Sequence, residues 1–153
     1  MSQTASAGPS PVVSADLHLE VRYFYVRQMR LLDEGHSEEF AETFSDDGVF
    51  HHTSATGAPP RGRAEIAAAA KAALGLRPGL VPRHWFDMML VEPRADGSLY
   101  VTYQAVVSRT DATGAVDFEP TVFVEDELVR EDGRLLNRSR TIHRDDLRLS
   151  GGR

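Results

Sequence analysis

The stretch Pro82–Glu92, PRHWFDMMLVE, decides the fold, because there the pattern of apolar residues changes from helical to extended. In an extended strand, successive side chains point to opposite faces of the sheet. One predicted face therefore carries His84, Phe86, Met88 and Leu90. A histidine at the start of an apolar strand face is either a core residue with a satisfied hydrogen bond or an acid–base group that faces a water-poor pocket.

Four extended runs begin with this stretch, at about residues 82–93, 98–109, 117–131 and 134–144. Two of the three connections contain Asp-Gly, a strong signal of a tight β-hairpin, in ADGS (95–98) and EDGR (131–134). The third connection, TDATGA (110–115), is longer and polar. These features predict an antiparallel meander in the second half of the chain.

Helical patterns fill most of the first half. Ser14 is placed to cap a helix that runs to about Leu32, with Gly35 just past its end. Ser37 is placed to cap a second, short helix, EEFAETF (38–44), and VFHHT (49–53) reads as a short strand. The run RAEIAAAAKAAL (63–74) is a strong helix former that closes at Gly75.

Helices followed by a meander predict an α+β domain, with three N-terminal helices packed on a curved antiparallel sheet. A sheet of long, twisted strands that curls under helices makes a cone-shaped barrel with an open mouth, and His84 would lie on its inner wall. We expect one domain over residues 14–148, with disordered tails at 1–13 and 149–153.

Composition excludes several classes of function. The chain has 153 residues, a net charge of −6 and no cysteine. The negative charge disfavours nucleic acid and anionic membrane surfaces as partners. Without cysteine there is no disulfide, thiolate nucleophile or zinc–sulfur site. No apolar run is long enough to span a membrane and no secretory signal is visible, so a cytoplasmic protein is expected.

Several segments resemble the nuclear transport factor 2-like superfamily of cone-shaped α+β folds. They are FYVRQMRLLDEGHSEEFAETFSDDGVFHH, RGRAEIAAAAKAAL, RHWFDMMLVE and SRTIHRDDL, within about Leu17–Leu147. The chain is most similar to SnoaL-like proteins, in particular to small cyclase/dehydratase-type proteins of aromatic polyketide biosynthesis. It also resembles the β-subunits of ring-hydroxylating dioxygenases, which are structural subunits.

The resemblance implies an acid–base pair. Dehydratases of the superfamily use a histidine on the corresponding strand with an aspartate from the first helix, and the matching residues here are His84 and Asp33. Histidine titrates near neutral pH and can move a proton at a carbon beside a carbonyl. Asp33 alone also reads as a surface residue at a helix end, where an acid opposes the helix dipole.

Other candidate residues come from strand faces and helix spacing. Tyr25 shares a helix face with Asp33 and could polarise a substrate oxygen, or it could be a core tyrosine. His51 and His52 face opposite ways, and we expect His52 to face the pocket together with Phe50. The resemblance favours Arg140 as the last-strand arginine that holds a substrate oxygen. The expected aromatic and apolar lining adds Phe86, Met88 and Tyr103.

Some alternatives stay open at this stage. Either Glu125 or Asp126 could point inward, and Arg140 could equally form a surface or interface ion pair. No HxH or HExxH pattern predicts a metal site, and no phosphate-binding or dinucleotide motif predicts a cofactor.

The sequence thus predicts a cofactor-free cyclase, dehydratase or isomerase that acts on a hydrophobic aromatic carbonyl compound. The alternatives are a non-catalytic scaffold or accessory subunit and a small-ligand binding protein. The apolar outer face of the sheet predicts a homodimer.

Overall fold

The computed structural model describes residues 12–150, which form four helices and six strands. The helices are α1 (Ala15–Asp33), α2 (Ser37–Glu42), α3 (Gly62–Gly75) and α4 (Asp145–Ser150). The strands are β1 (Phe44–His52), β2 (Val81–Pro93), β3 (Leu99–Thr110), β4 (Val116–Phe118), β5 (Val122–Glu131) and β6 (Arg134–Arg144).

All six strands belong to one sheet, in the order β1-β6-β5-β3-β2, with β4 paired to the end of β3. The pairs among β2, β3, β5 and β6 are antiparallel, as the two Asp-Gly turns predict. β1 differs, because it runs parallel to β6 at the edge of the sheet. The predicted meander is therefore correct for the second half of the chain, and the complete sheet is mixed.

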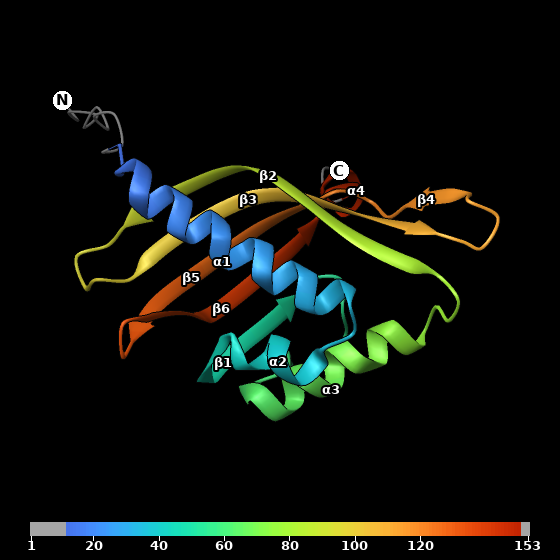
Figure 1. Cartoon of the computed structure of the whole chain (residues 1–153), viewed down its shortest axis with the longest axis horizontal. Helices are drawn as coiled ribbons and strands as arrows, with labels where there is room; N and C mark the ends of the chain where they lie inside the picture. The colour runs from blue at the N-terminus through green and yellow to red at the C-terminus, as the bar shows by residue number, and fades with distance from the viewer. Residues whose placement is uncertain (1–11, 151–153) are drawn as a thin grey trace.

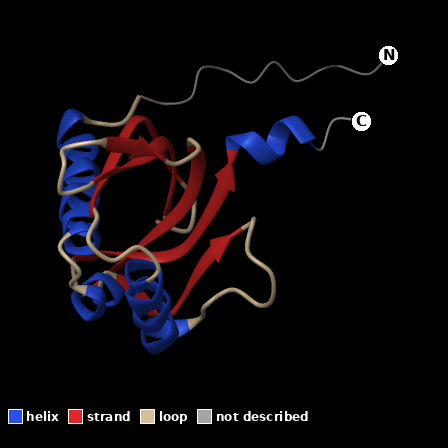
Figure 2. Ribbon diagram, turned by 90° about the vertical axis from the view of Figure 1, so that its right-hand side faces the viewer, coloured by secondary structure: helices blue, strands red, loops and turns tan. Residues whose placement is uncertain are grey.

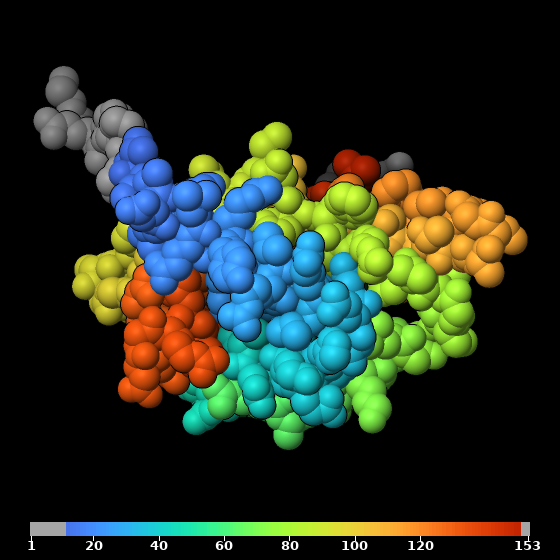
Figure 3. Space-filling model, in the orientation of Figure 1, coloured from blue at the N-terminus to red at the C-terminus, as the bar shows by residue number. Residues whose placement is uncertain are grey.

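The sheet is strongly curved and the helices lie on its concave side, so the predicted cone-shaped α+β fold is confirmed (Figures 1 and 2). α1 lies across the concave face, while α2 and α3 pack beside β1 (Figure 1). One core cluster joins α1 to β2, β3 and β5, and a second joins α2, α3 and β1. Figure 3 shows the end of the β3–β4 hairpin extending beyond the helical body.

The helix ends agree in part with the sequence. Ser14 caps α1 as predicted, because its Oγ accepts a hydrogen bond from the backbone N–H of Leu17 at 3.2 Å. Ser37 does not cap α2, which is a correction: Ser37 is the first residue of that helix, and His36 precedes it without a side-chain cap. The segment SDDG (45–48), which lies between the predicted helix and the predicted strand, belongs to β1.

The structure describes a few residues on either side of the predicted domain, 14–148. Val13 packs against the core, and residues 149 and 150 belong to α4. The rest of the predicted tails, residues 1–11 and 151–153, lies outside the described residues. No helix within residues 12–150 combines the length and apolar character needed to cross a membrane.

A β-bulge in β2 reverses the predicted alternation of side chains. The pairing of β2 with β3 shifts between Asp87 and Leu90, and Met88 has a positive φ of 55°. Met88 is consequently 71% exposed, while Met89 is 7% exposed and packs in the core. The prediction that Met88 lines the pocket is therefore wrong, because the extra residue of a bulge changes which side chains face inward.

The predicted run 117–131 is two strands. β4 ends at Phe118 and β5 begins at Val122, so Glu119, Pro120 and Thr121 form a break between them. Proline lacks a backbone N–H and cannot continue a strand ladder on that side. The break places Glu119 and Pro120 beside the hollow of the cone.

Candidate active site

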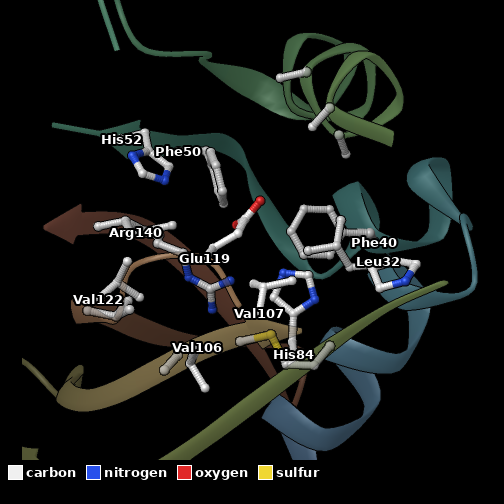
Figure 4. A pocket seen from close by; sticks show the side chains of 18 of the residues that line it. Leu32, Phe40, Phe50, His52, His84, Val106, Val107, Glu119, Val122 and Arg140 are labelled. Carbon is white, nitrogen blue, oxygen red and sulfur yellow. The ribbon is translucent and has the colours of Figure 1, made fainter. Parts of the chain in front are cut away.

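A cavity of about 230 Å³ lies between the concave face of the sheet and the helices (Figure 4). Most of its wall is apolar. The apolar residues are Met29, Leu32, Phe40, Phe50, Ile66, Ala69, Ala70, Ala73, Leu74, Pro82, Ala105, Val106, Val107, Pro120, Val122, Val124 and Ile142. Such a wall suits a flat hydrophobic ligand, with specificity left to the few polar groups.

His84 and Asp33 form a close pair at the cavity wall. His84 Nδ1 lies 2.6 Å from Asp33 Oδ1. The backbone N–H of His84 also donates to the Asp33 carboxylate, at 3.1 Å to Oδ2 and 3.2 Å to Oδ1. Asp33 is the last residue of α1, and His84 lies near the start of β2. The sequence-predicted pair is thus brought together from two elements that lie far apart in the chain.

This contact sets which nitrogen of His84 is available. An ionised carboxylate only accepts hydrogen bonds, so the Nδ1 that faces Asp33 carries the hydrogen in the neutral ring. Nε2 is then the basic nitrogen. His84 lines the cavity, and Figure 4 shows its ring extending from β2 toward the interior. The arrangement can take a proton at Nε2 and stabilise the resulting imidazolium through Asp33.

A second histidine lines the cavity from another side. His52, at the end of β1, lies across from His84 in Figure 4, whereas His51 is not among the lining residues. His52 Nδ1 lies 2.9 Å from Ser54 Oγ. Burial, helped by the charge of Arg144, lowers the pKa of His52 below its ordinary value of 6.5, so its ring is neutral near pH 7.

Tyr25 does not line the cavity, so the sequence-based proposal that it contacts a substrate oxygen is corrected. It has no exposed surface and packs in the core between α1 and the sheet. Burial, with the nearby Asp126 carboxylate, raises the pKa of Tyr25 well above its ordinary value. Tyr103 does line the cavity, but its hydroxyl is buried and makes no hydrogen bond to the described residues.

Phe86 is displaced from the predicted lining as well. Its ring packs edge-on against Tyr25 and Tyr103, with centroid distances of 5.8 Å in both pairs. Phe86 borders a separate, open recess beside α1, which also contains Asp33 and His84, instead of the main cavity. Its ring therefore supports the wall of the cone and lies behind the cavity surface.

Arg140 lines the cavity but is held by a buried network. Its Nη2 donates to Asp126 Oδ2 at 2.8 Å and to Gln28, and its Nε donates to Asp126 Oδ1 at 3.0 Å. Asn137 donates to Asp126 at 2.9 Å. Burial acts to lower the pKa of Arg140, but Asp126 outweighs it and the pKa is raised. Asp126, and not Glu125, is therefore the inward carboxylate.

Sequence reasoning missed two polar residues of the site, Arg109 and Glu119. Arg109 lies near the end of β3, and Glu119 lies in the break before β5. Arg109 donates to Glu119 Oε1 from Nε at 3.0 Å and from Nη2 at 2.8 Å. Pro120 was the one local signal that a strand run ends here and that its neighbour turns inward.

The described part of the chain offers no evident metal site. Within it, no group of three or more His, Asp or Glu side chains is arranged to hold an ion. The polar groups of the cavity are instead two histidines, one tyrosine, two arginines and one glutamate. Such a set can transfer protons and hold substrate oxygens by itself.

A curled sheet with helices over its concave face and a mostly apolar interior cavity defines a nuclear transport factor 2-like protein. Residues 13–141 match the SnoaL-like domain family, so the chain belongs to that family. No curated protein matches the chain significantly.

Solved structures of family relatives cover nearly the whole chain. Aln2 from a Streptomyces species is 45% identical with a TM-score of 0.87, over 92% of this chain and 99% of Aln2. ActVI-ORFA from Streptomyces coelicolor is 35% identical with a TM-score of 0.81, over 86% and 99%. A Catenulispora acidiphila protein solved in complex with S-DNPA is 34% identical with a TM-score of 0.79, over 90% and 99%.

Proposed function

We propose that this protein is a cofactor-free cyclase, dehydratase or isomerase that acts on a polyketide-like aromatic carbonyl compound. The observation that carries the proposal is the 2.6 Å contact between Asp33 and His84 at the wall of an apolar cavity. A histidine oriented by a carboxylate in a site of low water content is a general acid–base device.

The proposed chemistry is a proton transfer in two steps. His84 Nε2 takes a proton from the carbon beside a carbonyl group, and the electron pair moves to the carbonyl oxygen as an enolate. Asp33 stabilises the imidazolium that forms. The imidazolium then returns its proton to a carbon, giving isomerisation, or to a departing hydroxyl group, giving water and a new double bond. In this proposal the neutral His52, which lines another side of the cavity, holds a substrate oxygen.

The substrate class is supported by the cavity and by the relatives. Most of the wall is aromatic and aliphatic, which favours a flat, partly aromatic ligand. The relative from Catenulispora acidiphila was solved with a small molecule, S-DNPA. The resemblance to cyclase/dehydratase-type proteins of aromatic polyketide biosynthesis points to the same class of compound.

Hydrogen–deuterium exchange tests the proposed chemistry without the natural substrate. The probe is 2-tetralone, a bicyclic aromatic ketone whose α-protons exchange in D₂O at a rate that NMR can follow. The wild-type protein should accelerate exchange above the buffer rate, His84→Ala should abolish the acceleration, and Asp33→Asn should reduce it. His51→Ala is the matched control, because His51 does not line the cavity. Equal rates for wild type and His84→Ala would rule out the proposed role.

A binding protein without turnover is the second candidate, favoured by the relative solved with S-DNPA. The same cavity would serve both functions. Binding of S-DNPA measured by calorimetry, without any accelerated exchange of 2-tetralone, would support the binder over the enzyme.

We further propose a homodimer formed through the outer face of the sheet. Trp85 on β2 and Phe118 on β4 are 57% and 67% exposed. Large apolar side chains of this kind favour burial against a second copy. Light scattering of the wild type and of Trp85→Glu with Phe118→Glu tests this: the wild type should have twice the mass of the variant. The cytoplasmic location expected from the sequence stays a prediction.

A further inference from the structure

The two histidines that line the cavity come from opposite edges of the sheet. β1 and β2 are the outermost strands in the sheet order, His52 is the last residue of β1, and His84 lies near the start of β2. The curvature of the sheet brings both rings to one cavity, and Figure 4 shows them on different sides of it. His84 Nδ1 contacts a carboxylate, whereas His52 Nδ1 lies 2.9 Å from a hydroxyl group, Ser54 Oγ. The two rings therefore have chemically different partners.

A tight turn after β1 places Ser54 beside the ring of His52. The backbone N–H of Ala55 donates to the carbonyl oxygen of His52 at 2.9 Å, which closes a β-turn. Thr53, inside the turn, donates to the carbonyl oxygen of Ile142 from its backbone N–H and from its Oγ1, at 3.0 Å in both cases. These bonds attach the turn to β6, so the backbone sets the position of Ser54. Ser54 itself is exposed, while the ring of His52 lines the cavity.

The surroundings of His52 favour its neutral ring. Burial lowers the pKa of His52, and Arg144 and the adjacent His51 act in the same direction. Glu119 acts in the opposite direction, and Asp146 pairs with Arg144 at 2.7 Å, but the net effect is a lowered pKa. A neutral imidazole has one N–H donor and one bare nitrogen that accepts. The partner of one ring nitrogen therefore decides what the other nitrogen can do.

We propose that Ser54 is a positioning residue: its hydroxyl donates to Nδ1 of His52, so that His52 presents an Nε2–H donor to a carbonyl oxygen of the substrate. At His84 the carboxylate of Asp33 requires the opposite tautomer, with the hydrogen on Nδ1 and a basic Nε2. Nε2 of His52 makes no hydrogen bond to the residues 12–150, so a ligand can accept its hydrogen. The cavity then holds one base and one N–H donor instead of two bases.

The inference rests on the proposed function for the proton transfer at His84, and it assigns the group that stabilises the enolate. When His84 Nε2 takes the proton from the carbon beside the carbonyl group, the electron pair of that C–H bond moves to the carbonyl oxygen. The oxygen gains negative charge, and the Nε2–H of His52 donates a hydrogen bond to it without giving up its proton. A donor that is already oriented toward such an oxygen stabilises the transition state more than the bound ketone.

NMR of the protein labelled with ¹⁵N-histidine reads the tautomers directly, at a pH where both rings are neutral. Wild-type His52 should carry its hydrogen on Nε2 and wild-type His84 on Nδ1, and His52→Gln and His84→Ala assign the two sets of signals. Ser54→Ala should give a mixture of tautomers at His52, whereas Ser54→Thr, which keeps the hydroxyl group, should retain the wild-type form. Thr53→Val is the matched control, because it removes a neighbouring hydroxyl group that donates to Ile142 and not to the ring.

Exchange of 2-tetralone in D₂O, measured over a range of ketone concentrations, gives the functional consequence. Ser54→Ala should lower kcat about tenfold and leave KM nearly unchanged, because the donor acts mainly on the charged oxygen of the transition state. Ser54→Thr should restore the rate, and Thr53→Val should not change it. Titration with 2-naphthylacetamide, a neutral bicyclic aromatic amide, should also shift the Nε2–H signal of His52, because the amide oxygen accepts its hydrogen bond.

The outcomes separate this inference from the proposed function. A hydrogen on Nδ1 of wild-type His52 would overturn the inference, and so would an unchanged tautomer or an unchanged kcat in Ser54→Ala. A His52 signal that does not respond to saturating 2-naphthylacetamide would overturn it as well. The role of His84 is tested by His84→Ala, whose loss of exchange does not depend on the tautomer of His52. An Nε2–H tautomer at His52 that is lost in Ser54→Ala, together with most of kcat, would support the inference.

Discussion

Asp33 holds His84 at two points, its ring nitrogen Nδ1 at 2.6 Å and its backbone N–H at 3.1 Å. The ring contact fixes the tautomer, and the backbone contact fixes the position of the carboxylate relative to β2. A single hydrogen bond would leave Asp33 free to rotate away from the ring. The double contact also explains why an acid is tolerated at the C-terminal end of α1. The unfavourable interaction of Asp33 with the helix dipole is offset by the hydrogen bonds that its carboxylate accepts from His84.

Asp33→Asn should therefore lower catalysis through the orientation of His84. We expect a loss of about a hundredfold in the exchange rate of 2-tetralone, within the usual range for general acid–base catalysis. The Nδ1–H proton of wild-type His84, held by a carboxylate, should give a downfield ¹H NMR signal that the variant lacks. An unchanged signal would show that the carboxylate does not hold the ring in solution.

The buried pair of Arg140 and Asp126 should be important for stability. Removing one partner of a buried ion pair leaves an uncompensated charge and costs about 3–5 kcal/mol. Asp126→Ala should lower the free energy of unfolding, measured in urea, by about this amount. Replacing both partners, as in Asp126→Leu with Arg140→Met, should cost less than Asp126→Ala alone.

An exposed pair provides the matched control for this comparison. Arg130 and Glu20 contact at 2.6 Å with side chains 43% and 45% exposed. Glu20→Ala should cost less than about 1 kcal/mol, because solvent screens exposed pairs. If Asp126→Ala lowered the free energy of unfolding by no more than Glu20→Ala does, the buried network would not be important for stability.

The fold could be predicted from local signals, while the exact wall of the cavity could not. The Ser14 cap, the strong helix formers of residues 63–74 and the two Asp-Gly turns are local properties of the chain, and they place α1, α3 and the hairpin turns correctly. The bulge at Met88 depends on how β2 fits the curvature of the whole sheet, and no local signal marks it. The same holds for the parallel pairing of β1 with β6.

The candidate site divides in a similar way. The pairing of Asp33 with His84 was predicted only through the family resemblance of the sequence, because no local pattern around either residue indicates the other as its partner. The position of Tyr25, in the core or at the cavity, could not be predicted from its helix face, because residues of that face contact both. Arg109 and Glu119 were not predicted either, because their contact depends on a break at Pro120, and the run 117–131 was interpreted as one continuous strand.

The bulge in β2 gives a prediction that distinguishes the two neighbouring methionines. Met88 has a left-handed φ of 55° that glycine adopts at little cost, so Met88→Gly should be neutral or stabilising by up to about 1 kcal/mol. Met89→Ala should cost about 2–4 kcal/mol, because it leaves a void in the core. Urea unfolding of both variants measures the two losses. A larger loss for Met88→Gly than for Met89→Ala would mean that Met88 faces the core and that β2 has no bulge.

Small side chains on α3 keep the cavity open. Ala69, Ala70 and Ala73 line it, so a larger residue on this helix face should occupy the ligand space. Ala69→Phe should weaken binding of 2-naphthylacetamide about tenfold or more, the effect of a steric overlap of about 1–3 kcal/mol. Ala68→Phe, one residue away and exposed, is the matched control. Equal affinity in the two variants would show that the ligand binds elsewhere.

His52 gives the folded protein a defined response to acid. Burial lowers its pKa below the ordinary value of 6.5, so below that pH the unfolded chain binds a proton that the folded protein does not. Stability must therefore fall as the pH drops from about 6.5 to the folded pKa, and the loss is constant at lower pH.

The variant His52→Gln should lack the part of the acid-induced loss of stability that the His52 ring causes. Urea unfolding of both proteins should give a stability difference that is constant above about pH 7.5 and shifts in favour of the variant below pH 6.5. Glu119 acts in the opposite direction on His52, and Arg144 and His51 act in the same direction as burial. A difference that shifts in favour of the wild type in acid would mean that the attraction of Glu119 exceeds the cost of burying the charged ring.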